Sequence, residues 1–150
     1  MKIRTLQLSD VEVASGVCIA AFDQSVASSL PAEGIETFAK ISAPEAFRER
    51  MSKDTMMLVA EIETNIVGFA ELREGNHVSM LFVRPDRQQQ GIGKALLTQL
   101  IKHARSPSIS VSASLSSVTA YQTFGFILSG EINQIAGLIY QPMTMTLPNE

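Results

Sequence analysis

The sequence has 150 residues, of which 45% are apolar and 18% are charged, and its formal net charge is −3. A chain of this length can bury a hydrophobic core, and we expect residues 1–150 to form a single domain. The weak negative charge argues against a nucleic-acid partner that relies on a basic surface. One cysteine excludes an intramolecular disulfide, and no apolar run reaches the ~18 residues of a membrane span. These features predict a cytoplasmic protein without a nucleic-acid or membrane partner.

The first 55 residues predict one strand followed by helices. Apolar residues alternate imperfectly with polar ones near the N-terminus, and Ser9 or Asp10 provides a helix cap directly after this stretch. Pro44 stands at a position favoured in the first turn of a helix. We therefore expect a strand at 2–8, a helix from about 10 to 28, a loop at 29–34, and short helices at 35–41 and 44–51.

The remaining residues predict a sheet interrupted by two helices, and thus an α/β fold with one mixed sheet. Strand-like segments are separated by short polar turns such as Thr64–Asn65, and Pro85 ends the third of them. Apolar residues recur at helical spacing after Gly91. The expected elements are strands at 56–63, 66–74 and 77–83, a helix at 91–105, a strand at 108–114, a helix at 116–125, and strands at 126–132 and 137–147. The last of these either completes the sheet or crosses to a second subunit of a homodimer.

The loop before the first of these two helices, RPDRQQQGIGKALLTQL at 84–100, has two glycines at the helix start. Unpaired N–H groups and the positive end of the helix dipole favour anions there, and glycine lets a ligand approach the main chain. The alternative is that Gly91 and Gly93 only permit a tight entry into the helix. Gln88 and Ala95 exclude a P-loop, and Leu96 excludes a dinucleotide-binding fingerprint.

The pattern that remains is Gln-x-x-Gly-x-Gly at 88–93, after a strand ending in Leu-Phe-Val and before an apolar helix. A second segment, 114–126, carries Tyr121 in the sequence Tyr-x-x-x-Gly-Phe. In these motifs and in its order of elements the chain resembles the GNAT superfamily of N-acetyltransferases, least clearly over residues 25–55. The resemblance implies a central, mostly antiparallel sheet with one splayed parallel strand pair, flanked by helices.

The resemblance also implies that acetyl-coenzyme A binds as co-substrate, without a metal ion. Main-chain N–H groups of the glycine loop would bind its diphosphate, the preceding strand would hold the pantetheine arm, and an N–H near Phe82 or Val83 would stabilise the oxyanion. Gln88 lacks the charge of the arginine that the family often has, and Ser114 replaces a common asparagine. The implied cofactor-binding residues are Leu81, Phe82, Val83, Gln88, Gln89, Gln90, Gly91, Ile92, Gly93, Lys94, Ser114 and Ser117.

Tyr121 resembles the general acid of the family. A phenol with a pKa of about 10 is a suitable proton donor to the departing thiolate. The alternative is a tyrosine whose ring packs and whose hydroxyl is satisfied. Cys18 lies within a helix among apolar residues, which is typical of an inert buried thiol. An acyl-cysteine route is therefore less favoured than direct transfer through a ternary complex.

The sequence does not decide which group takes the proton from the acceptor ammonium. The strand at 77–83 contains no glutamate, which leaves Glu71, His77 or a chain of waters. His77 has a suitable unperturbed pKa. Glu71 shares a face of its strand with Phe69 and Arg73, and could instead form a plain ion pair.

The sequence therefore favours an enzyme that acetylates a primary amine of a small molecule or peptide. Glu33, Glu36 and Glu45 favour a cationic amine. Transfer of a longer acyl group stays open. The alternative from another class is a non-catalytic acyl-coenzyme A sensor or regulatory module, which would keep the loop at 88–94 and need neither Tyr121 nor a base.

Overall fold

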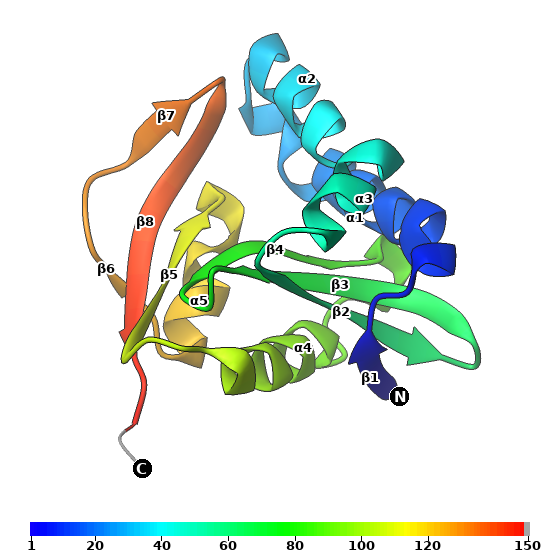
Figure 1. The fold of residues 1–150 in the computed structure, drawn as a ribbon. Coiled ribbons are helices and arrows are strands. Elements are labelled where there is room, and N and C mark those ends of the chain that lie inside the picture. The colour runs from blue at the N-terminus through cyan, green and yellow to red at the C-terminus, as the bar shows by residue number, and fades with distance from the viewer. Residues whose placement is uncertain (149–150) are drawn as a thin grey trace.

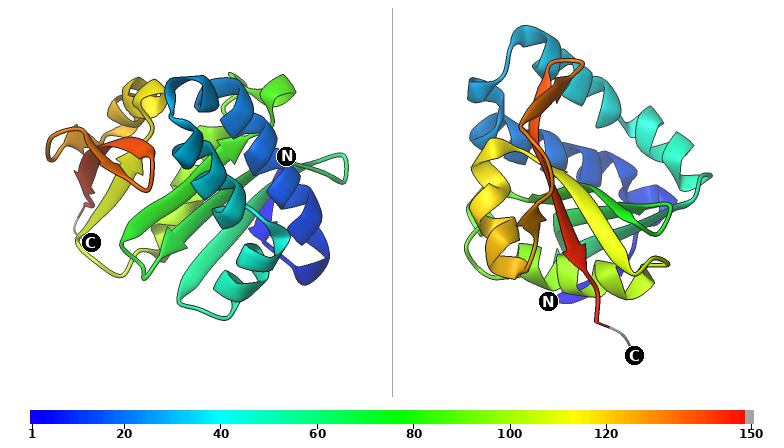
Figure 2. Two further views of the ribbon diagram at one scale, coloured as in Figure 1. Left: turned by 90° about the horizontal axis from the view of Figure 1, so that it is seen from above. Right: turned by 90° about the vertical axis from the view of Figure 1, so that its left-hand side faces the viewer.

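The computed structural model describes residues 1–148, in which eight strands form a sheet with helices on both faces (Figure 1 and Figure 2). The α/β class expected from the sequence is confirmed. The strands are β1 (Lys2–Thr5), β2 (Thr55–Ile62), β3 (Asn65–Arg73), β4 (His77–Val83), β5 (Ser108–Ala113), β6 (Ile127–Leu128), β7 (Asn133–Ile135) and β8 (Leu138–Thr146). The α-helices are α1 (Val11–Ser25), α2 (Ala32–Ile41), α3 (Pro44–Met51), α4 (Ile92–Leu100) and α5 (Val118–Phe124).

The strands follow the order β1-β2-β3-β4-β5-β8-β6, and β7 pairs with β8. All paired strands are antiparallel except β4 and β5, which are parallel. These two strands pair only where His77 meets Ser110 and Val78 meets Val111. Beyond this point they separate, so a gap opens between their C-terminal ends. The splayed parallel pair expected from the sequence is therefore present.

A β-bulge lies where this gap begins. Glu71 on β3 pairs with Met80 of β4, whereas the next residue, Leu72, pairs with Val78. Ser79 is the extra residue between them. A bulge bends its strand and increases the local twist. Because it follows directly after the last pairing of β4 with β5, this bulge turns β4 away from its neighbour.

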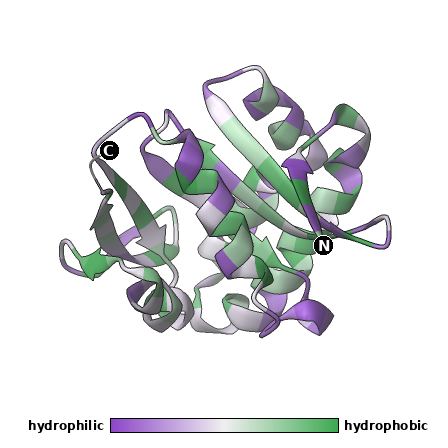
Figure 3. Ribbon diagram, turned by 90° about the horizontal axis from the view of Figure 1, so that it is seen from below, coloured by the Kyte–Doolittle hydropathy of each residue, from purple (hydrophilic) through white to green (hydrophobic). Residues whose placement is uncertain are grey.

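The sheet buries a hydrophobic cluster on each face. Helices α1, α2 and α3 cover β2–β4 on one face, where Phe47 and Phe69 are fully buried (Figure 2). On the other face, Leu96 and Leu100 of α4 are buried in the cluster, whereas Lys94, Thr98 and Gln99 are exposed. Hydrophobic and hydrophilic residues accordingly alternate along this helix (Figure 3). Burial of side chains this large contributes about 1.5–3 kcal/mol each. The two clusters hold the bulged strand β4 between them.

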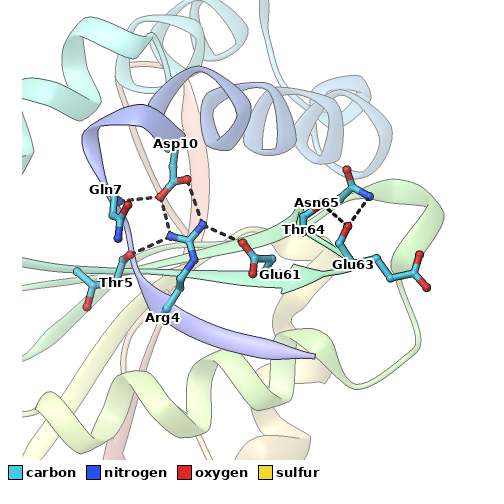
Figure 4. A network of polar contacts seen from close by, with 8 residues as sticks. All are labelled: Arg4, Thr5, Gln7, Asp10, Glu61, Glu63, Thr64 and Asn65. Carbon is cyan, nitrogen blue, oxygen red and sulfur yellow. Dashed lines mark hydrogen bonds and ion pairs between the residues drawn. The ribbon is translucent and has the colours of Figure 1, made fainter.

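The N-terminal strand is fastened by an ion-pair network around Arg4 (Figure 4). Its guanidinium donates to both carboxylate oxygens of Asp10, at 2.8 and 3.1 Å, and to Glu61 of β2 at 3.0 Å. Asp10 also accepts the main-chain N–H of Gln7 at 2.7 Å. The hydrogen bonds from Arg4 lower the pKa of the Asp10 carboxyl. The network joins β1, the start of α1 and β2.

Several expected boundaries were wrong. The strand expected at 2–8 ends at Thr5, and Leu8 already belongs to a 3-10 turn. Residues 32–34, expected in a loop, belong to α2, because Pro31 is extended and starts the helix directly. The helix expected at 91–105 ends at Leu100 and continues only as a 3-10 turn. The strand expected at 126–132 is reduced to β6, and β7 follows it separately. The final strand, β8, completes the sheet by pairing with β5 of the same chain. No helix among residues 1–148 has both the length and the apolar character required to cross a membrane.

Candidate active site

The loop between β4 and α4 presents a continuous row of unpaired N–H groups. Within the described residues, no main-chain N–H of 88–94 donates to a protein acceptor, and the first to do so is Ala95, to the carbonyl of Gly91 at 3.0 Å. Gln89 and Gly91 adopt left-handed conformations, with φ of 63° and 81°. Successive N–H groups in such a turn form a concave anion site, and the dipole of α4 adds positive potential. The loop is exposed and can bind an anion from solution.

Glycine stands at the two positions of this loop for different reasons. Gly91 has a positive φ, which side chains disfavour, so the turn itself requires it. Gly93 has no positive φ, and a Cβ added there would lie 3.6 Å from Cγ2 of Val83, an ordinary contact. Tight entry into the helix therefore explains Gly91 but not Gly93. Close approach of a ligand to the main chain would account for Gly93.

Strand β4 directs part of its main chain into the gap. The N–H of Arg84 donates to the carbonyl of Val67 on β3 at 2.7 Å, so the hydrogen-bonding groups of Phe82 also face β3. Those of Leu81 and Val83 face the opposite side, where β5 has separated. Gln88 donates its side-chain amide to the carbonyl of Val83 at 3.1 Å and so ties the loop to the strand end. Of the residues expected to offer an N–H to a ligand in the gap, Val83 is available and Phe82 is not.

Tyr121 lies on α5 and belongs to the hydrophobic cluster on the face of the sheet that α4 covers. Its ring is buried and packs edge-on against Phe126, with the ring centroids 5.3 Å apart. Its hydroxyl makes no hydrogen bond to any residue of the described chain, and burial raises the pKa of this hydroxyl. The phenol therefore stays protonated and free to donate.

The turn before α5 is held by Ser114 and Ser117, whose hydroxyl oxygens lie 2.9 Å apart.

Glu71 is buried, and both of its carboxylate oxygens are occupied. One accepts Nε of Arg50 at 2.9 Å, and the other accepts the hydroxyl of Ser79 at 2.6 Å. Arg50 comes from α3 and also donates to the carbonyl of Ile41 at 2.7 Å. The sequence placed Arg73 on the same face, but the ion pair forms with Arg50, 21 residues away along the chain. No local signal in the sequence indicates this partner.

His77 is half-buried at the joined end of β4 and β5. Its Nδ1 lies 2.8 Å from the hydroxyl oxygen of Ser110, and that hydroxyl points to the carbonyl of Asn76 at 3.4 Å. We assign the Nδ1–H as the donor to Ser110 on the basis of this chain of bonds, which leaves Nε2 with a free lone pair. Burial, and the nearby charge of Arg73, lower the pKa of the imidazole below its ordinary value of 6.5. The ring is therefore neutral at neutral pH, with the lone pair of Nε2 exposed to a proton donor, although it is a weaker base than a free imidazole.

Cys18 is fully buried in α1, and burial raises the pKa of its thiol. The nucleophilic thiolate form is therefore disfavoured at neutral pH. The expectation of a buried cysteine is confirmed.

Comparison with known sequences identifies relatives among the acetyltransferases. Residues 26–147 match the family model described as an acetyltransferase (GNAT) domain. The chain is 28% identical over 126 residues to the uncharacterized N-acetyltransferase YafP of Escherichia coli K12, an alignment that spans 84% of this chain and 81% of that protein.

Solved structures show the same architecture. The GCN5-related N-acetyltransferase of Rhodopseudomonas palustris, also described as a class-II aminotransferase, superposes with a TM-score of 0.85 at 25% identity, over 97% of this chain and 95% of that chain. The PaiA N-acetyltransferase of Thermoplasma acidophilum, solved with coenzyme A, superposes with a TM-score of 0.77 at 21% identity, over 97% and 98% of the two chains. At 21% identity, the likeness to the Thermoplasma acidophilum protein shows a shared fold.

Proposed function

The chain belongs to the GNAT family of acetyltransferases, and on that premise we propose that it transfers the acetyl group of acetyl-coenzyme A to a primary amine of a small molecule or peptide. One observation carries the proposal: the row of unpaired N–H groups at 88–94 lies beside the gap between β4 and β5. An anion-binding loop next to a gap lined by free main-chain groups suits a cofactor with a diphosphate and an amide-containing arm.

In this proposal the N–H groups from Gln88 to Lys94 bind the diphosphate, and the pantetheine arm enters the gap. The gap-facing N–H of Val83 donates to the arm near the loop, while its C=O accepts the side-chain amide of Gln88. Leu81 lies deeper, next to the bulge, so its N–H is the group we assign to the developing oxyanion. Ser114 and Ser117, at the end of β5, supply hydroxyls on the opposite side of the gap.

The reaction is a direct transfer. The amine attacks the thioester carbonyl, so that a C–N bond forms and the C–S bond breaks. Tyr121 gives its proton to the departing thiolate. His77 accepts the proton of the acceptor ammonium at Nε2, directly or through one water. Glu71 is bonded at both oxygens to Arg50 and Ser79, and we therefore propose that it positions the bulge rather than removing the proton.

The test combines two measurements on the wild-type protein. Calorimetry measures acetyl-coenzyme A binding, and a thiol-release assay measures turnover with a panel of amines and amine-bearing peptides. Binding together with turnover on one class of amine is the expected result. Binding without turnover on any amine would instead indicate the non-catalytic sensor. Absence of binding would overturn the cofactor role of the loop at 88–94.

A further inference from the structure

A polar surface pocket of about 260 Å³ lies at the joined end of β4 and β5. Arg73 pairs with His77 across β3 and β4, and His77 pairs with Ser110 across β4 and β5, so the three side chains lie on one face of the sheet. Alternation along β3 places Arg73 on the same face as Glu71. The pocket is lined by Arg73, Asn76, His77, Ser106, Ser108 and Ser110.

The lining of this pocket contains a cation and several hydroxyls but no carboxylate. Arg73 forms no ion pair with any residue among 1–148. Five of the other six arginines do: Arg4, Arg48, Arg50, Arg84 and Arg105. An arginine without a carboxylate partner offers a planar set of donors that matches a carboxylate or phosphate. Serine hydroxyls beside it can donate to the same oxygens.

Two of the three acidic side chains that favoured a cationic acceptor, Glu36 and Glu45, form surface ion pairs, whereas Glu33 forms none with any residue among 1–148. Glu36 lies 3.5 Å from Nζ of Lys40, and Glu45 lies 2.8 Å from a guanidinium nitrogen of Arg48. These pairs reduce the local negative potential on α2 and α3. The charge near His77 is instead positive, because Arg73 is close enough to lower the imidazole pKa.

We propose that this pocket binds an anionic group, a carboxylate or a phosphate, carried by the acceptor amine, with Arg73 as its charge partner. The proposal rests on the proposed function, because it takes His77 as the group that meets the acceptor nitrogen. His77 belongs both to the pocket and to the reaction. The amine and the anionic group of the acceptor are therefore expected to be only a few bonds apart, as in an amino acid, a short peptide or an amino-alkyl phosphate.

The first test requires no catalysis. The chain contains two histidines, His77 and His103, so their imidazole NMR signals can be separated by one substitution. Glycylglycine should shift the His77 signal saturably in the cofactor-free protein, and glycylglycinamide, which has the same amine without the carboxylate, should not. Phosphoethanolamine against ethanolamine repeats the comparison for phosphate and distinguishes the two anions. The His103 signal serves as the internal control.

Arg73→Gln should abolish the His77 shift, whereas Lys102→Gln, which removes an equal charge from the exposed turn after α4, should preserve it. In the thiol-release assay, kcat/KM should favour the anionic member of each pair by about tenfold or more, and Arg73→Gln should remove this preference while leaving acetyl-coenzyme A affinity unchanged. Equal shifts with neutral and anionic ligands, no shift with either anion, or a preference that survives Arg73→Gln would overturn the proposal. Failure of acetyl-coenzyme A binding would count against the proposed function alone.

Discussion

Nε of Arg50 lies 2.9 Å from one carboxylate oxygen of Glu71, while the other oxygen accepts the hydroxyl of Ser79 at 2.6 Å. The three residues come from α3, β3 and the bulge of β4. The carboxylate is 2% exposed, and a buried charge of this kind is stable only while its partners remain. Helix α3 is thereby coupled to the bulge at which β4 leaves β5.

Glu71 should tolerate glutamine but not alanine. Glu71→Gln can still accept from Arg50 and bond Ser79, so kcat should remain within about tenfold of wild type, far from the 10²–10⁴-fold loss of a missing general base. Glu71→Ala leaves Arg50 and Ser79 without their carboxylate partner and should lower the free energy of unfolding by about 2–4 kcal/mol. The loss is no larger because Arg50 remains partly solvated. Thermal denaturation and initial rates measure the two effects.

Ser79→Ala provides the matched control, since it removes the contact to the bulge and leaves the carboxylate. It should weaken acetyl-coenzyme A binding more than it lowers kcat. If Glu71→Gln instead lost about 10²-fold in kcat with unchanged cofactor affinity, Glu71 would be the proton acceptor and the positioning role would be wrong.

Gly93 and Gly91 should respond oppositely to alanine. Gly93→Ala adds a methyl group where the protein has room and where alanine favours the helix, so the free energy of unfolding should stay unchanged or rise by up to about 1 kcal/mol. Acetyl-coenzyme A affinity should nevertheless fall by about tenfold or more, which is roughly 1.4 kcal/mol. Gly91→Ala forces alanine into a positive φ and should cost about 1–2 kcal/mol in stability. If Gly93→Ala bound acetyl-coenzyme A as tightly as the wild type, the proposal that the cofactor binds at this loop would be wrong.

The features that we assign to the cofactor could be predicted from the sequence because their signals are local. The turn at 88–93 and Tyr121 are encoded in short runs whose spacing fixes their geometry. The gap also follows from the order of strands, since β4 and β5 are the parallel neighbours. The bulge at Ser79 does not show in the sequence, because alternation along 77–83 appears intact and only the register with β3 reveals the extra residue.

The features that we assign to the acceptor could not be predicted, because they depend on contacts between distant segments. Arg50 meets Glu71 only after α3 packs on the sheet, and Arg73 joins Ser110 only through the pairing of β3, β4 and β5. The start of α2 was missed for a different reason: Pro31 and Gly34 are turn-forming residues, yet Gly34 is needed where α2 meets the main chain of Gly137.

The pKa of His77 predicts a pH-dependent contribution to stability. The folded protein lowers this pKa below 6.5, so the unfolded chain binds the proton more readily. Stability should therefore be undiminished above about pH 6.5 and decline as the pH falls through the folded-state pKa. His77→Asn, whose amide can still donate to Ser110, should flatten this decline in denaturation curves between about pH 7 and 5. An identical decline in His77→Asn would assign it to other groups.

Tyr121 should prove necessary for turnover but not for folding or cofactor binding. Tyr121→Phe keeps the ring that packs against Phe126 and removes a hydroxyl that bonds to no described residue, so the melting temperature should be unchanged. Because that hydroxyl is the donor assigned to the thiolate, kcat should fall by about 10²-fold or more. Acetyl-coenzyme A affinity, measured by calorimetry, should remain within about threefold, since binding relies on the main chain of the loop and β4. A variant with full turnover would show that the thiolate leaves without a proton from Tyr121, and a variant that loses cofactor binding would give the tyrosine a structural role.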